Sequence, residues 1–94
     1  DESKYYLYTS FTGGTIMGRN MTSLTSNLKL MLTANGIPFE IVDVATDDRA
    51  RRIWTRRSNG KLLPGLVKGE DVVGNYEDLE DANEYGELLD MVTE

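Results

Sequence analysis

The chain contains no cysteine and no histidine. Disulfides, thiol–disulfide exchange and cysteine-based metal sites are therefore excluded, because each of them needs a sulfur atom. The commonest general base and the commonest metal ligand are missing as well. A serine or threonine hydroxyl needs an adjacent base to become a nucleophile, and the sequence shows no such arrangement. We therefore expect no enzyme activity, no cofactor and no metal.

Proline and long apolar runs are also scarce. Only Pro38 and Pro64 are present, and no run approaches the ~18 apolar residues that a membrane helix needs. No signal-peptide pattern occurs, and the chain begins with Asp1 rather than methionine. Its 94 residues are the length of one domain. We expect residues 1–94 to form a single domain excised from a longer protein, with no membrane contact.

Positive charge is absent from one end of the chain. All ten lysines and arginines lie between Lys4 and Lys68, and the six acids of residues 1–68 leave that part with a net charge of +4. Residues 69–94 carry ten acids and no base, which makes their net charge −10. Such a separation predicts charge-steered protein contacts, including a homodimer, although solvated helix faces explain it equally well. The overall net charge of −6 argues against a nucleic-acid partner.

Periodicity predicts the element order β-α-β-α-β-β-α. Alternating or continuous apolar residues predict strands, and apolar residues three and four apart predict helices. The glycine-containing stretch 11–20 between the first strand and the first helix is expected to be a loop. The last helical segment is expected to break near Gly86. Strands are predicted at 4–10, 37–44, 65–69 and 71–75, and helices at 21–35, 47–57 and 76–92.

The second predicted helix, "DDRARRIWTRR", combines an apolar stripe with an arginine stripe. Thr46 is the expected N-cap. The inward stripe is expected to hold Ala50, Ile53, Trp54 and Arg57, and the outward stripe Arg49, Arg52 and Arg56. Arginine is enriched in interface hot spots, so the outward stripe is a candidate partner-binding face for an acidic protein surface. A solvated helix face is the alternative.

Four segments in this order resemble the glutaredoxins, which have a thioredoxin-like fold. They are "YLYTS", "ANGIPFEIVDV", "LLPGLVKGEDVVGNYEDL" and "EYGEL". The resemblance implies an α/β domain with a four-stranded mixed sheet flanked by helices. It covers nearly the whole chain, yet the reactive cysteine of the glutaredoxins is missing.

Two stretches are similar to the Src-homology-3-binding, glutamic-acid-rich adaptor family. They are "ANGIPFEIVDVA" and the pattern Gly-Asn-Tyr-Glu-x-Leu-x-x-Ala-x-Glu at residues 74–84. The proline-rich ligand motif of that family is absent here, so a role as a Src-homology-3 ligand is not supported. The chain also resembles the glutaredoxin-like domain that ends a large fungal polarisome protein of actin assembly. That resemblance implies actin as a partner and a cytoplasmic, cytoskeleton-associated location.

The resemblance to glutaredoxins also implies a vestigial glutathione site. Its members would be Leu63, a cis peptide bond between Leu63 and Pro64, and the acids Glu77 and Asp78 at the start of the last helix. In glutaredoxins the residue before the proline offers its backbone to glutathione, and the acids hold the glutamyl end. The alternatives are a proline that only begins a strand and acids that only stabilise the helix dipole.

The loop at residues 11–21 is longer than in ordinary glutaredoxins and holds apolar residues, including Met17. Loops often carry function and methionine suits adaptable contacts, so Met17 and Arg19 are further candidates for partner binding. Packing over the edge of the core is the alternative. We expect a non-catalytic interaction and dimerisation module of a larger scaffold. The alternative is a glutathione- or small-anion-binding domain without redox turnover.

Overall fold

A four-stranded mixed sheet forms the centre of the molecule. The computed structural model describes residues 3–11, 15–16 and 18–93. In the sheet the strands lie in the order β4-β1-β5-β6, with β1 parallel to β4 and the other two pairs antiparallel. The strands are β1 (Tyr5–Thr9), β4 (Glu40–Asp43), β5 (Gly65–Lys68) and β6 (Asp71–Asn75). Along the chain these four strands follow one another as predicted, and the predicted fold class, with a four-stranded mixed sheet, is confirmed.

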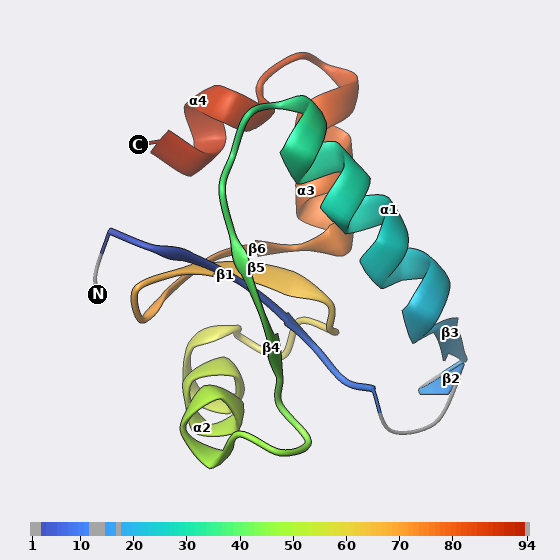
Figure 1. Ribbon diagram of the computed structural model, residues 1–94, viewed down its shortest axis with the longest axis vertical. Helices are drawn as coiled ribbons and strands as arrows, with labels where there is room; N and C mark the ends of the chain where they lie inside the picture. The colour runs from blue at the N-terminus through green and yellow to red at the C-terminus, as the bar shows by residue number, and fades with distance from the viewer. Residues whose placement is uncertain (1–2, 12–14, 17, 94) are drawn as a thin grey trace.

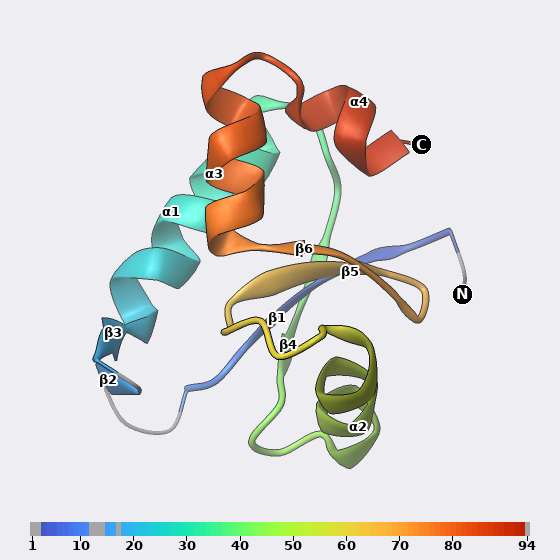
Figure 2. The ribbon, with the colours of Figure 1, turned by 180° about the vertical axis from the view of Figure 1, so that it is seen from behind.

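Helices cover both faces of the sheet. They are α1 (Met21–Ala34), α2 (Asp48–Arg57), α3 (Tyr76–Glu84) and α4 (Leu88–Thr93). Figure 1 shows α1, α3 and α4 on one side of the sheet and α2 alone on the other, and the reverse view in Figure 2 shows the same three layers. The break between α3 and α4 falls at Gly86, as predicted, with a φ of +71°. Glycine adopts this backbone conformation without the steric cost that other residues pay.

The core consists of two apolar clusters, one on each face of the sheet. Successive residues of a strand point to opposite faces, so Leu7 and Leu66 face α1, α3 and α4, whereas Tyr8 and Val67 face α2. Ala50, Ile53 and Trp54 of α2 are buried, as predicted. Arg57 is not: its side chain is half exposed and pairs with Asp71, so its assignment to the inward stripe was wrong. A guanidinium group is more stable beside a carboxylate at the surface than in the apolar core, where it would lose its water.

The segment before α1 differs from the predicted loop. Two short strands, β2 (Thr15–Ile16) and β3 (Arg19–Asn20), pair antiparallel as a small hairpin. The hairpin leads directly into α1, and Asn20 is the N-cap, accepting a hydrogen bond from the Ser23 backbone N–H at 3.0 Å. Residue Arg19 is therefore fixed immediately before the first helix. Met17, the other candidate of this segment, lies outside the described residues.

The start of α2 also corrects the sequence-based prediction. Asp47, not Thr46, is the N-cap, and its side chain accepts a hydrogen bond from the Ala50 backbone N–H at 2.9 Å. Aspartate is as good an N-cap as serine or threonine, so the run of three such residues, 46–48, left the position of the cap ambiguous.

Among the described residues, no helix is both long and apolar enough to cross a membrane.

Candidate functional site

The turn before β5 contains the predicted cis peptide bond between Leu63 and Pro64. Four successive carbonyl groups lead through this turn, and each accepts a hydrogen bond from within the chain. The Lys61 carbonyl accepts from the Trp54 indole at 3.1 Å, and the Leu62 carbonyl from the Asn75 amide at 3.1 Å. The Pro64 carbonyl accepts from the backbone N–H of Tyr76 at 2.8 Å. The turn is thus tied to α2 on one side and to α3 on the other.

The remaining carbonyl, that of Leu63, is held by Arg19. The Arg19 Nε donates to it at 3.1 Å. The other two nitrogens of the guanidinium meet both carboxylate oxygens of Glu77 at 2.9 Å each. Such a two-point contact between a guanidinium and a carboxylate is among the stronger polar interactions in proteins. The Arg19 side chain is only 16% exposed, so it fills the space between the hairpin, the turn and the start of α3.

Three residues of the implied glutathione site, Leu63, Pro64 and Glu77, are therefore brought together. The group that joins two of them is Arg19, which the sequence suggested as a partner contact. The resemblance places the backbone of glutathione on the residue before the proline and its glutamyl end on the acids of α3. In this chain the Arg19 side chain already contacts the Leu63 carbonyl and Glu77. The glutathione role of these residues stays a prediction, and the contacts weigh against it.

Asp78 belongs to a helix cap rather than to the contacts of Arg19. Its backbone N–H donates to the Asn75 side chain at 3.1 Å, and its side chain accepts from the Asn75 N–H at 3.1 Å, which completes a capping box. Lys61 pairs with the same carboxylate at 2.8 Å. Burial alone raises the pKa of Asp78, but the hydrogen bonds from Lys61 and Asn75 outweigh it, so the pKa lies below its ordinary value.

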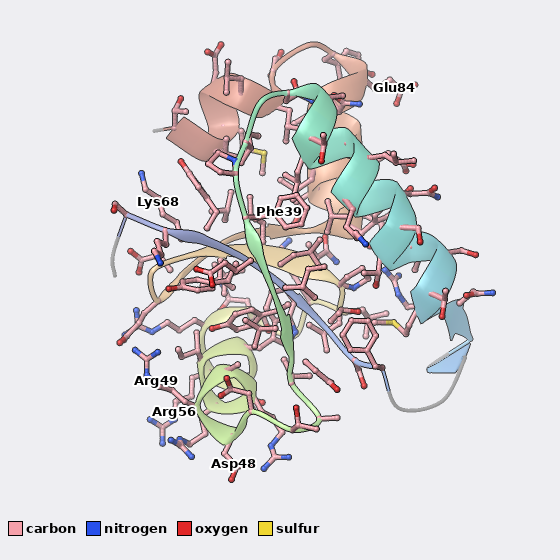
Figure 3. All side chains as sticks on the ribbon, viewed as in Figure 1. Phe39, Asp48, Arg49, Arg56, Lys68 and Glu84 are labelled. Atoms are coloured by element: carbon pink, nitrogen blue, oxygen red, sulfur yellow. The ribbon has the colours of Figure 1, made fainter. Side chains whose placement is uncertain are left out.

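A second cluster lies on the opposite side of the sheet, on α2 and the turn between β5 and β6. Three of the predicted contact residues, Arg49, Arg52 and Arg56, come together here, and Figure 3 shows Arg49 and Arg56 pointing away from the sheet. We call this feature the arginine groove. It has a volume of about 260 Å³ and is lined by Arg49, Arg52, Ile53, Arg56, Arg57 and Glu70.

Of the acids that the structure describes, Glu70 alone lines the arginine groove. It lies in the two-residue turn between β5 and β6 and pairs with Arg49 at 2.5 Å and with Arg57 at 3.7 Å. Within the described residues, Arg52 and Arg56 form no ion pair. Neither Glu70 nor Arg57 was among the predicted contacts. No sequence signal places a hairpin turn beside a particular helix face, so these two could be found only from the structure.

The described apolar residues at the two ends of the segment 11–21 differ in exposure. Met21 is buried in the first turn of α1 and is part of the core, so it is not available to a partner. Phe11 is 61% exposed and lies on the surface.

No group of three or more acids gathers into a metal site among residues 3–11, 15–16 and 18–93.

Comparison with known proteins places the chain in a family. The profile of the family described as SH3-binding, glutamic acid-rich protein matches residues 7–93. The chain belongs to this family. Like the glutaredoxins it has a thioredoxin-like fold, and its backbone is similar to that of the holo form of glutaredoxin C1 from Populus tremula x tremuloides, with a TM-score of 0.66 at 14% identity over 97% of the chain and 84% of that protein. Because this family member lacks cysteine, glutaredoxin thiol chemistry is excluded.

Closer relatives in this family are fungal. The solved structure of the C. albicans actin interacting protein Aip5 is 42% identical with a TM-score of 0.85, over 94% of this chain and 86% of that one. Wild-type actin interacting protein 5 is 40% identical with a TM-score of 0.83, over 97% and 99% of the two chains. The uncharacterized protein YFR016C of Saccharomyces cerevisiae is 43% identical over 98% of this chain. The chain spans only 7% of the length of that yeast relative.

Proposed function

We propose that this domain is a non-catalytic interaction module of a larger scaffold protein, and that it works in actin assembly with actin as its partner. The observation that carries the proposal is the likeness, at 40–42% identity over nearly the whole chain, to two structures titled actin interacting protein. The absence of cysteine supports a binding rather than a redox role. A cytoplasmic, cytoskeleton-associated location follows from such a partner.

The arginine groove is the contact face that we propose for the partner. Arg49, Arg52 and Arg56 are exposed on one side of α2. Guanidinium groups retain little water compared with ammonium groups and match carboxylates with a flat fork of donors, which suits them to protein interfaces. An acidic protein surface is the complementary partner. Arg19 is not part of this face because Glu77 and Leu63 hold its side chain.

A homodimer is the second part of the proposal. The described part of residues 69–94 holds nine acids and forms α3, α4 and the strand before them, and Glu84 lies at the far end of the molecule from α2 in Figure 3. The acidic end of one copy is thus complementary in charge to the arginine groove of another. Glutathione binding, the alternative from the sequence, gains no support from contacts that already commit the Leu63 carbonyl and Glu77.

Charge reversal tests the contact face. Arg52→Glu and Arg56→Glu should each weaken actin binding by about tenfold, because each replaces an attraction with a repulsion. The measurement is the affinity for monomeric and filamentous actin, by fluorescence titration and by co-sedimentation. Arg51→Glu is the matched control, since Arg51 is exposed on the same helix but pairs with Asp48 and does not line the groove. Equal weakening by all three variants would contradict the assignment.

A further inference from the structure

The arginine groove contains two classes of arginine. Arg49 and Arg57 share the carboxylate of Glu70, and Arg57 also donates to the Glu70 carbonyl oxygen at 3.2 Å. Arg52 and Arg56 line the same groove, and within the described residues neither has a carboxylate partner. Four guanidinium groups thus line one groove, where the Glu70 carboxylate pairs with two of them and Asp71 pairs with Arg57 from outside the lining. Like charges at this spacing repel, so the groove attracts further negative charge.

Glu70 shows which chemical group the groove accepts. Its carboxylate bridges two guanidinium groups that come from different turns of α2. The residue lies at the tip of a two-residue hairpin turn and its side chain is 48% exposed. An exposed ion pair of this kind contributes little to stability, so the side chain can leave the groove at small cost. A second carboxylate can then take its place.

We propose that the arginine groove is a docking site for an acidic peptide segment of a partner protein, and that Glu70 is an internal competitor for the partner's carboxylates. This inference rests on the proposed function, because it specifies the partner chemistry of the same face. The incoming segment pairs first with Arg52 and Arg56. A further carboxylate of the segment then displaces Glu70 from Arg49 and Arg57.

Removal of the competitor distinguishes this arrangement from simple surface attraction. In Glu70→Gln the groove loses its own carboxylate while the hairpin turn keeps a side chain of the same size. Arg49 then becomes available without displacement, while Arg57 keeps its ion pair with Asp71. We expect this variant to bind an acidic peptide about twofold to fivefold more tightly than the parent chain, the range that one exposed ion pair allows. Arg52→Gln should weaken binding by a similar factor.

The probe is a hexaglutamate peptide, with hexaglutamine as the neutral control. NMR signals of the arginine side-chain Nε–Hε groups report each guanidinium separately during the titration. The indole N–H of Trp54, which donates to the Lys61 carbonyl, shows in the same spectrum that each variant is folded. Asp48→Asn is the matched charge control: it also removes one carboxylate from an arginine pair, but Arg51 and Asp48 lie outside the groove.

Tighter binding by Glu70→Gln, with Asp48→Asn near the parent value and the Arg52 and Arg56 signals shifted, is the expected result. Equal gains in both variants, or no gain in Glu70→Gln, would overturn the proposal. So would saturation by inorganic phosphate without any response to hexaglutamate. If actin binding depends on Arg52 but hexaglutamate does not bind, this inference fails and the proposed function stands. If hexaglutamate follows the expected pattern but actin does not bind, actin as the partner fails and the acidic-peptide site stands.

Discussion

Arg19 is the residue that ties two of the candidate glutathione positions, Leu63 and Glu77, into the fold. It stands just before the first helix, where the resemblance to glutaredoxins would place the reactive cysteine. Its side chain is mostly buried and makes three polar contacts, two with Glu77 and one with the Leu63 carbonyl. A buried guanidinium needs such partners, because a lost partner leaves a desolvated charge. One arginine thus joins the hairpin, the cis-proline turn and α3.

Removal of Arg19 should therefore destabilise the fold. Arg19→Ala loses a two-point ion pair and a hydrogen bond from a charged donor, and we expect the free energy of unfolding to fall by about 1–2 kcal/mol. Urea denaturation followed by circular dichroism measures this change. Lys4→Ala is the control, since the ion pair of Lys4 with Glu40 is exposed on both sides and should contribute much less. Similar losses in the two variants would show that Arg19 has no special structural role.

At the scale of the elements, polar contacts at the start of α3 tie that helix to its neighbours. Asn75 and Asp78 exchange hydrogen bonds in a capping box, and Lys61 adds an ion pair to the Asp78 carboxylate. The Asn75 amide also reaches the Leu62 carbonyl at 3.1 Å. The cap therefore binds the helix to the turn before β5. These contacts explain why the pKa of Asp78 is lowered despite its partial burial.

Because the pKa of Asp78 is lowered in the folded chain, the stability of the fold around α3 depends on pH. A carboxyl group whose pKa is lower in the folded than in the unfolded chain stabilises the fold above the unfolded value. The ordinary value is 3.8. Stability should therefore be fully present above about pH 4 and decline as the pH falls through the lower, folded value. In the Asp78→Asn variant, stability should fall less steeply with acid than in the parent chain. Acid titrations followed by circular dichroism measure this difference.

Asp48→Asn supplies the comparison for that experiment. Asp48 also lies in the first turn of a helix, but its side chain is 72% exposed and its ion pair is with Arg51, a residue of the same helix. Its removal should leave the acid-induced decline close to that of the parent chain. If Asp78→Asn and Asp48→Asn titrate alike, the capping box and Lys61 do not account for the acid sensitivity.

The sequence predicted the helices and sheet strands better than it predicted the side-chain contacts between them. Apolar periodicity located the four sheet strands and the buried face of α2, because burial requires those residue types at that spacing. The hairpin before α1 was missed, since strands of two residues carry no periodicity. Arg57 has the spacing of an inward residue, yet it turns to Asp71, a contact that depends on where the β5–β6 turn lies. The roles of Arg19 and Glu70 depend on such tertiary contacts too.

At the scale of the whole molecule, charge is distributed unevenly over the fold. The arginines of α2 project from one side of the sheet, and the acidic helices α3 and α4 cover the other (Figures 1 and 3). In the proposed homodimer, the resulting electric dipole would orient the two copies head to tail, with the acidic end of one at the arginine groove of the other. It also predicts how that association responds to salt.

Self-association through these charges should weaken as salt is added. The Debye length falls from about 8 Å at physiological ionic strength to about 3 Å at 1 M, and exposed charges are then largely screened. Sedimentation velocity at low and high salt measures the dimer fraction. A dimer that persists or grows at high salt would point to an apolar interface instead. Two surface hollows share Phe39, one beside the start of β1 and the other beside α1, and they would fit such an interface.

The proposed partner contacts lie at the arginine groove and not at the cis-proline turn. An amide NMR titration of the labelled domain with unlabelled monomeric actin tests this placement most directly. We predict that the signals of Arg49, Arg52, Arg56 and the β5–β6 turn broaden or shift first, while those of Leu63 and Glu77 stay in place. Changes confined to Leu63, Glu77 and the hairpin before α1, with the groove silent, would contradict the account.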